Sequence, residues 1–491
     1  MNYLIIFYIL GFVIKIEGIL LLFPTVAGLI YGEKEFFSFL ICAVGCLLIG
    51  GLATLKKPKN QVFFAKEGFV TVALSWIVVS IFGAIPFVLN GDIPRFTDAF
   101  FETASGFTTT GASILTNVEA LSHASLFWRS FTHWIGGMGI LVFLLSLLPI
   151  AGGATMHLMR AESPGPQVGK IVPKIKDTAL ILYIIYSVLT VLEMIILICG
   201  KMPVFDAITL SLGTAGTGGF AVKNTGLAEY SAFSQYVIAI FMIMFGINFN
   251  AYFLIMKKRF KDAFRVEEVR WYLGIIIFSV AVITLNTLGA FETVEEAFRH
   301  ALFQVGSLIT TTGFSTIDYN AFYPAICKIF VVILMFCGAC AGSTGGGTKV
   351  SRIVILAKSV RAEISRIVHP NAVKKVRFEG KPVEELVLRS ISLYFAAYLF
   401  IFVSSLIIIS FDNFDFTTNF TAVLSAFNNI GPGLSKVGPA GNFSEFSNLS
   451  KYVLSFDMIA GRLEIFPMLI LLSPATWRRS AILRKHKKAA Q

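Results

Sequence analysis

The chain has 491 residues, of which 56% are apolar and 14% are charged, and its mean hydropathy is +0.76. Soluble globular domains have about 45–50% apolar and about 25% charged residues, which excludes a chain of several soluble domains. A disordered chain and a secreted disulfide-rich module are also excluded, and the long apolar runs indicate a membrane protein with many spans. The net charge of +12 would suggest nucleic-acid binding on a soluble chain, so its meaning depends on where the basic residues lie.

Ten apolar runs are long enough to cross a membrane as helices, since a helix needs about 20 apolar residues to span the hydrocarbon core. The first run contains Lys15 and Glu17, and it lacks the basic start and cleavage site of a signal peptide, so we interpret it as a retained span. In chain order the predicted spans cover residues 4–31, 36–55, 69–90, 126–150, 178–200, 232–256, 271–291, 322–357, 387–411 and 452–474.

The 41 Lys and Arg residues are distributed unevenly between the two sides of the membrane. Twenty-nine lie on one side and six on the other, and the remainder lie within spans or at their edges. The positive-inside rule places the basic side and both termini in the cytoplasm. The net charge therefore reflects topology, and no nucleic-acid partner is expected. The basic segments are 56–68, 151–177, 257–270, 352–389 and the tail from 475.

Four outer connections form an internal repeat. Each contains a short helix-like piece followed by a turn rich in Thr or Gly, within residues 96–113, 205–222, 297–316 and 416–435. Aligning the turns places four glycines in one column, roughly a hundred residues apart, which indicates a repeated unit of span, half-helix, turn and span. The aligned glycines are Gly111, Gly219, Gly313 and Gly431. The predicted divisions are two N-terminal spans in 1–64 and four repeats in 65–174, 175–268, 269–386 and 387–491.

The chemistry of these turns suits a dehydrated cation. Four equivalent units around one axis bring their turns together, where carbonyl oxygens can replace the water shell of the ion. Glycine permits the close approach of the backbones, and the C-terminal ends of the half-helices add partial negative charge. The residues of the four turns that would form this cation-binding filter are Thr109, Thr110, Gly111, Thr217, Gly218, Gly219, Thr311, Thr312, Gly313, Asn429, Ile430 and Gly431.

Acidic residues in or near the half-helices have two interpretations. They either cap and anchor these helices or raise the cation concentration at the outer mouth. We favour capping for Asp98 and Asp206, which lie near helix starts. The other two acids are Glu102 and Glu296.

The eighth predicted span is too long for one membrane helix. From Phe322 to Lys358 it would extend about 55 Å, against a hydrocarbon core of about 30 Å. The glycine-rich run near its middle predicts a break. This break is either a packing kink or, as we favour, a flexible loop that blocks the pore from below. The predicted gate consists of Gly342, Ser343, Thr344, Gly345, Gly346, Gly347 and Thr348.

Arg462 lies at the centre of the last predicted span, where an Arg costs at least about 2.5–3.5 kcal/mol on insertion scales. No acid three or four residues away can pair with it. We predict that it faces the pore below the filter and holds the gate loop through loop carbonyls, with a purely structural tie between helices as the alternative. Lys349 follows the loop and is expected to seat it, whereas Glu193, Lys328 and His133 are expected to tie helices together.

The motifs together resemble one family across essentially the whole chain. They read FFETASGFTTTGAS (100–113), HWIGGMGILVFLLSLLP (133–149), GTGGFAV (216–222), TTTGFST (310–316), GACAGSTGGGTK (338–349), FNNIGPGLSKVGP (427–439) and GRLEIFPMLILLSP (461–474). The chain resembles the bacterial Trk-type potassium uptake membrane subunits, within the Trk/Ktr/HKT superfamily.

The resemblance implies an all-α membrane protein of two N-terminal spans and four span–pore helix–filter–span repeats in pseudo-fourfold symmetry around one pore. It implies that the four aligned glycines line a selectivity filter. Some plant relatives have Ser in the first of these positions and prefer sodium, so Gly in all four positions of this chain implies a preference for potassium. It also implies the gate loop, a multi-pass location in the bacterial inner membrane, and a homodimer with one pore in each protomer. The implied partner is a cytoplasmic TrkA-like ring that binds nucleotides, which this chain itself does not bind. Segments 160–176, 257–270 and 358–386 are candidates for docking that ring.

The predicted function is potassium translocation through a channel-like pore. A potassium symporter coupled to protons or sodium stays open, although few carboxylates lie within the spans. A membrane-embedded enzyme is disfavoured because the six histidines are scattered and no carboxylate pair recurs near them. Apart from the potassium ion, no cofactor is expected.

Overall fold

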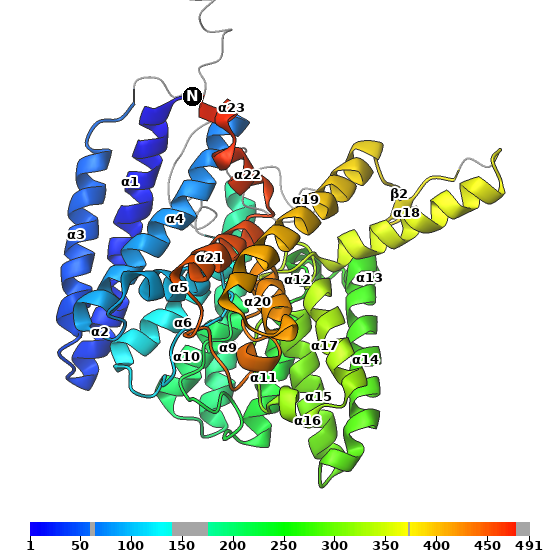
Figure 1. Cartoon of the computed structure of the whole chain (residues 1–491), viewed down its shortest axis with the longest axis horizontal. Helices are drawn as coiled ribbons and strands as arrows, with labels where there is room; N and C mark the ends of the chain where they lie inside the picture. The colour runs from blue at the N-terminus through cyan, green and yellow to red at the C-terminus, as the bar shows by residue number, and fades with distance from the viewer. Residues whose placement is uncertain (59–63, 140–174, 372–373, 478–491) are drawn as a thin grey trace, which may run out of the picture.

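The computed structural model describes residues 1–58, 64–139, 175–371 and 374–477, and these are mostly helical (Figure 1). Among them, six helical segments are long and apolar enough to cross a membrane, or seven if one bent pair counts as a span. The six are α1 with α2 (Tyr3–Leu20 and Leu22–Tyr31), α3 (Phe36–Thr54), α4 (Ala65–Asn90), α9 (Ile175–Cys199), α14 (Glu267–Thr287) and α19 (Glu385–Ile409).

A short pore helix follows the long helix of each repeat and packs against it. The inner helix of each repeat packs in turn against the pore helix of the next repeat, and the last inner helix packs against the first pore helix. The packing therefore closes into a ring of four units. The pore helices are α5 (Phe96–Phe107), α10 (Val204–Gly216), α15 (Val294–Ile309) and α20 (Phe416–Asn428). The inner helices begin with α6 (His123–Gly137), α11 (Ala232–Phe245), α17 (Ala325–Cys337) and α21 (Asn448–Arg462).

The inner helices are shorter than the sequence predicts. The break predicted in the third repeat is present, because residues 338–349 separate α17 from α18 (Val350–Val368). Two other spans predicted as continuous are not, so these two predictions are wrong. The sixth predicted span bends by 92° between α11 and α12 (Phe249–Met256). The last is interrupted after α21 and continues as α22 (Phe466–Leu472) and α23 (Pro474–Trp477). The second half of the span predicted at 126–150 lies outside the described residues.

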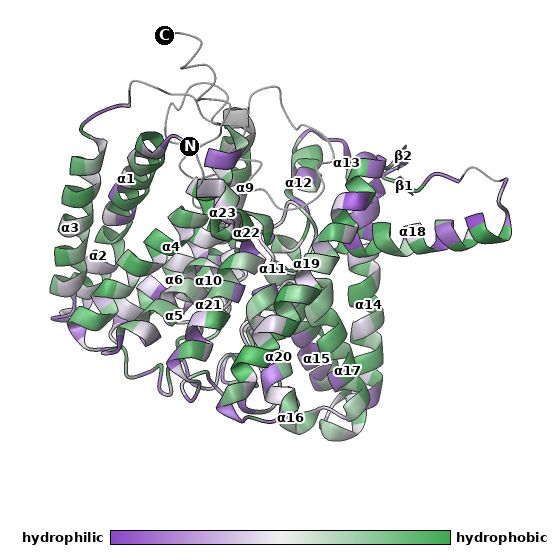
Figure 2. Cartoon of the chain, turned by 45° about the horizontal axis from the view of Figure 1, so that its top comes forward, coloured by the Kyte–Doolittle hydropathy of each residue, from purple (hydrophilic) through white to green (hydrophobic). Residues whose placement is uncertain are grey.

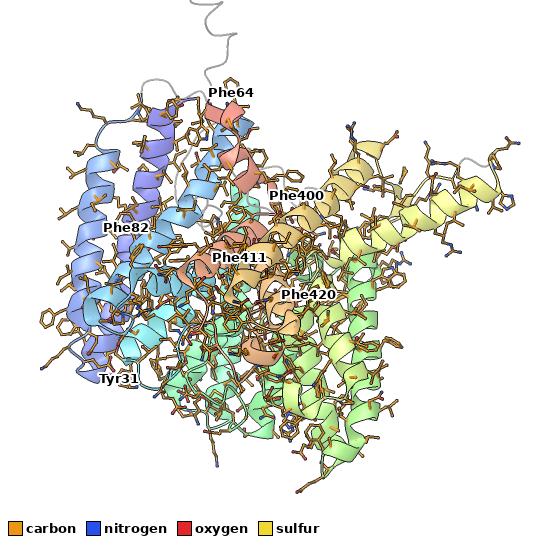
Figure 3. All side chains as sticks on the ribbon, viewed as in Figure 1. Tyr31, Phe64, Phe82, Phe400, Phe411 and Phe420 are labelled. Carbon is orange, nitrogen blue, oxygen red and sulfur yellow. The ribbon has the colours of Figure 1, made fainter. Side chains whose placement is uncertain are left out.

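The two N-terminal spans pack beside the first repeat. α1 packs against α3 and α4, while α2 packs against α6. A Cβ atom on Gly50 would lie only 2.6 Å from the carbonyl oxygen of Gly11, so small residues let α1 and α3 approach closely. Tyr31 and Phe64 mark opposite ends of this bundle (Figure 3). Hydrophobic residues predominate on α3 and α14 (Figure 2), and many of their large side chains are exposed, as expected for surfaces that face lipid.

The remaining elements are short. One antiparallel hairpin of β1 (Arg377–Phe378) and β2 (Lys381–Pro382) joins α18 to α19, so the fold departs from all-α only at this hairpin in the part of the chain that the structure describes. α18 projects away from the body of the molecule (Figure 1). The other elements are α13 (Phe260–Arg265), α16 (Tyr319–Phe322) and three 3-10 turns at Leu288–Ala290, Ser410–Asp412 and Ser435–Val437.

Candidate functional site

The turn after each pore helix repeats one backbone conformation. A residue in the left-handed region is followed two positions later by a glycine with positive φ. The glycines are those aligned from the sequence, Gly111, Gly219, Gly313 and Gly431, with φ of 78°, 81°, 88° and 98°. The left-handed residues are Thr109, Thr217, Thr311 and Asn429, with φ of 56°, 55°, 60° and 56°. Asn adopts this region more readily than most residues, so the fourth turn keeps the geometry without a Thr pair.

The four turns form a closed ring. Each aligned glycine lies against a carbonyl oxygen of the next turn, and the fourth turn closes on the first. In ring order the pairs are Gly111 with Gly218, Gly219 with Thr312, Gly313 with Ile430, and Gly431 with Thr110. A Cβ atom on any of the first three glycines would overlap its partner oxygen, and one on the fourth would lie 2.8 Å away. Carbonyl groups from all four repeats therefore meet at one level, an arrangement that can replace the water shell of a cation.

The hydroxyl groups of the turns have different partners. In the first turn Thr108 and Thr110 hydrogen-bond to each other at 2.8 Å, and Thr310 and Thr312 do the same in the third turn at 2.7 Å. These hydrogen bonds stabilise the backbone conformation of the first and third turns. The hydroxyl of Thr217 donates to the carbonyl of the preceding residue at 2.6 Å.

The acidic residues of the pore helices serve as anchors. Asp98 accepts a hydrogen bond from Lys451 at 2.6 Å, and Asp206 accepts one from Tyr230 at 2.8 Å. Both acids lie in the first turn of their pore helices, as does Glu296. These contacts fit the interpretation that the acids anchor the helices. The capping favoured for Asp98 and Asp206 is wrong, because the N-cap residues are Arg95 and Pro203 and neither helix has a side-chain capping bond.

Glu102 is buried deeper than the other three acids. It pairs with Arg129 at 2.9 Å and accepts hydrogen bonds from the hydroxyl of Ser113 and the amide of Ile114 at 2.9 and 3.0 Å. It therefore fixes the chain that leaves the first turn. Arg129 also lies over the ring of Phe220, 4.0 Å from its centroid, which joins the first repeat to the second.

A vestibule of about 200 Å³ opens on one side of the ring. All four aligned glycines line it, together with the residues that directly follow them in each turn. Its charged lining residues are Arg129 and Lys223, and none of the four acids discussed above is among them. The groups at this entrance that can attract a cation are therefore the backbone carbonyls of the turns rather than carboxylates.

The predicted gate residues lie against two turns of the ring. The amide of Gly346 donates to the hydroxyl of Thr311 at 2.6 Å. A Cβ atom on Gly346 would lie 2.6 Å from the carbonyl oxygen of Asn428, and one on Gly345 would lie 2.8 Å from that of Thr310. The segment therefore contacts the C-terminal ends of the third and fourth pore helices. The segment contacts residues that precede the aligned glycines, whereas the vestibule is lined by the glycines and the residues that follow them, so the segment and the vestibule lie on opposite sides of the ring.

The bend between α11 and α12 supplies backbone partners to the same segment. The amide of Phe249 donates to the carbonyl of Gly342 at 2.9 Å. The amide and hydroxyl of Thr344 donate to the carbonyl of Phe245 at 3.4 and 3.2 Å. Irregular backbone at membrane depth needs such partners, so the two broken helices satisfy each other. The other contacts are Ser343 with the carbonyl of Cys340, Thr348 with that of Phe336, and Gly347 packed on Gly338.

Arg462 joins the gate segment to the first repeat. Its guanidinium donates to the carbonyl of Thr344 at 2.8 Å and to those of Gly136 and Gly137 at 2.6 and 2.7 Å. Contact with a loop carbonyl agrees with the sequence interpretation. The predicted position at the centre of a continuous span is wrong, because α21 ends at this residue. The two glycine carbonyls at the end of α6 were not foreseen, since the sequence predicts a continuous helix there.

The residues expected to tie helices together occupy buried or half-buried positions. His133 contacts two repeats, because its Nδ1 lies 2.7 Å from the carbonyl oxygen of Gly106 and its Nε2 accepts from the amide of Phe220 at 3.3 Å. Glu193 is fully buried on α9, which packs against α10. Lys328 is half-buried on α17, and Lys349 donates to the carbonyl of Gly345 in the gate segment.

Two acidic residues near the gate segment escaped the sequence interpretation. Glu464 pairs with Arg352 at 2.5 Å, which links the break after α21 to the first turn of α18. Glu268 accepts backbone hydrogen bonds from Ala341 and Ser351, which lie on either side of the gate segment. The sequence carried no signal for either residue, because their partners lie too far away along the chain to be inferred.

Comparisons with known proteins agree with this architecture. The family model described as "TrkH: Cation transport protein" matches residues 35–479. The Trk system potassium uptake protein TrkH of Salmonella typhimurium is 37% identical over 95% of this chain and 97% of its own length. TrkG of Escherichia coli K12 is 33% identical over 95% of this chain and 97% of its own length.

A solved structure gives the same result for the fold. The crystal structure of the potassium transporter TrkH from Vibrio parahaemolyticus matches with a TM-score of 0.87 and 32% identity, over 97% of this chain and all of that chain. This match confirms the predicted class of helical, multi-pass membrane protein. The family consists of cation transport proteins, which confirms the prediction that the chain is not an enzyme. The chain belongs to the TrkH family of cation transport proteins.

Proposed function

We propose that this chain carries potassium ions across the bacterial cytoplasmic membrane through a pore at the centre of the four repeats. The closed ring of turns is the observation that carries the proposal, since carbonyl groups from all four repeats converge there. Glycine occupies all four aligned positions, which favours potassium over sodium. The names of the relatives, which are potassium uptake proteins, point the same way.

The proposed gate is the segment from Gly342 to Thr348 together with Arg462. Its support is its position directly under two turns of the ring, where it contacts the ends of α15 and α20. Segment and ring lie close enough that an ion leaving the ring meets the segment first. Arg462 adds positive charge at the same level, which opposes the passage of cations while the segment stays in place.

The proposed assembly is a homodimer with one pore in each protomer, docked on a cytoplasmic TrkA-like nucleotide-binding ring. The projecting helix α18 exposes the apolar side chains of Val360, Ile364 and Ile367, which supports contact with a second copy. The names of the relatives describe a system, which supports a further component. Both termini are proposed to face the cytoplasm, because most basic residues lie on that side.

Flux measurements on the purified full chain in proteoliposomes test the proposal. A reversal potential that follows the potassium gradient alone supports a pore. A reversal potential that depends on a proton or sodium gradient would instead establish the coupled symporter. An absence of potassium flux under every gradient would refute both functions.

A further inference from the structure

One buried carboxylate joins the two ends of the gate segment. Glu268 lies in the first turn of α14 and is only 3% exposed. Its Oε1 accepts a hydrogen bond from the amide of Ala341 at 2.7 Å and another from the amide of Ser351 at 3.1 Å. Ala341 directly precedes the segment, and Ser351 lies three residues after its end, in the first turn of α18. A single oxygen atom therefore binds the backbone on both sides of the segment.

Local chemistry explains why a carboxylate occupies this position. The first amides of α18 have no partner within their own helix, and the residue at its N-cap, Lys349, makes no side-chain capping bond. Glu268 supplies that cap from another helix, and its negative charge suits a helix N-terminus. Hydrogen bonds to a charged acceptor are about twice as strong as neutral ones. The carboxylate is therefore a strong tether for a glycine-rich segment with little internal structure.

The backbone of the same helix turn is held from the cytoplasmic side. Glu379 at the tip of the β1–β2 hairpin accepts hydrogen bonds from the amides of Glu267 and Glu268 at 2.8 and 3.3 Å. Glu267 in return accepts from the amide of Glu379 at 3.1 Å and pairs with Lys358 of α18. Lys358 also donates to the carbonyl of Arg377 in the hairpin at 2.9 Å. The hairpin and the first turn of α14 are thus fastened to each other.

These contacts form a continuous path from the exposed hairpin to the gate segment. The path runs from Glu379 through the first turn of α14 to the carboxylate of Glu268 and on to the two amides that flank the segment. We infer that Glu268 is a positioning residue that holds the segment under the ring, and that displacement of the hairpin moves this carboxylate and releases the segment. This inference rests on the proposed gate.

Basal potassium flux through the purified full chain in proteoliposomes tests this inference. Glu268→Ala removes the tether and is expected to raise flux about tenfold, within the usual range of coupling between sites. Glu268→Gln keeps an oxygen acceptor in place and is expected to restore flux to within about threefold of the unmodified chain. Glu363→Ala is the matched control, because this acid of α18 is exposed and pairs with its helix neighbour Arg366.

Glu379→Ala provides a second variant at the hairpin tip, where loss of the fold is not expected. It should raise flux by a smaller factor, and adding it to Glu268→Ala should cause no further increase, since both changes act on one path. Arg462→Ala in the same assay distinguishes a failure of the proposed gate from a failure of the role of Glu268. The role of Glu268 is refuted if Arg462→Ala raises flux while Glu268→Ala leaves it unchanged or lowers it. It is also refuted if Glu268→Gln changes flux as much as Glu268→Ala does. If neither Arg462→Ala nor Glu268→Ala changes flux, the gate itself is refuted.

Discussion

The ring of turns and the inner helices beneath it differ in symmetry. The ring repeats one backbone pattern four times, and each turn contacts the next through the same glycine and carbonyl positions. The inner helices share no such pattern. α6 ends at Gly137, α11 bends by 92° into α12, residues 338–349 separate α17 from α18, and α21 ends at Arg462.

This difference agrees with the two tasks proposed above, which are ion binding by the ring and gating by the inner helices. A spherical ion is best held by equal ligands on all sides, and repetition of one unit supplies them. A gate requires one element with two positions, which identical units around an axis do not single out. Five charged side chains gather around the irregular third repeat, in keeping with this division. These are Glu268, Lys349, Arg352, Arg462 and Glu464.

The largest effect is expected from a substitution that disrupts the ring of turns. In Gly219→Ala the added methyl group would overlap the carbonyl of Thr312, whose side chain is fixed by its bond to Thr310. The left-handed backbone adds roughly 1–2 kcal/mol of strain. We expect potassium flux in proteoliposomes to fall about a hundredfold, about 2.7 kcal/mol. Gly274→Ala is the control, since no atom lies within 4 Å of its added carbon. Flux within twofold of the unmodified chain would contradict a role for the ring.

The next largest effect is expected from a substitution in the irregular inner helices. Arg462→Ala removes three hydrogen bonds to the carbonyls of Thr344, Gly136 and Gly137. We expect basal potassium flux to rise about tenfold, because the gate segment loses a tether and the positive charge below the ring disappears. Arg366→Ala, which removes an exposed Arg of α18, serves as the control. If flux and its regulation both stay unchanged, the proposed role of Arg462 is wrong.

A third change alters the ring while keeping it open. Gly111→Ser places a side chain against Gly218, whose turn contains two adjacent glycines and can retreat further than the turn of Thr312. We expect flux to persist and the preference for potassium over sodium to fall several-fold, since one of four carbonyl groups moves. Reversal potentials in mixed potassium and sodium gradients measure this ratio. An unchanged ratio would count against the alignment of the four turns.

The smallest expected effect lies where the two regions meet. Thr311→Val removes the hydroxyl that accepts the amide of Gly346, a bond of about 1 kcal/mol or about fivefold in an equilibrium. We expect basal flux to rise by up to this factor. Thr217→Val is the matched control, because that hydroxyl bonds only within its own turn. Equal flux in the two variants would show that the contact between ring and gate segment has no effect on gating.

The sequence predicted the ring better than the inner helices. Positive φ at Gly111 and its three counterparts excludes most other residues, so the backbone requirement left a visible trace in the sequence. The three consecutive glycines at 345–347 likewise predicted the break in the third repeat. The interruption at Glu464 and Ile465 left no such trace, although both residues have positive φ. Neither residue type favours that conformation, so surrounding contacts such as the pair of Glu464 with Arg352 must stabilise it.

By itself the sequence determined the membrane location, the basic side, the four repeats and the aligned glycines, because these depend on hydropathy and on local backbone geometry. Only the tertiary structure decided where the inner helices break and which side chains reach the gate segment. The physical reason is distance along the chain. Several backbone groups freed at the breaks are satisfied by residues of other repeats, as when Arg462 binds Gly136 and when Glu268 binds Ala341 and Ser351.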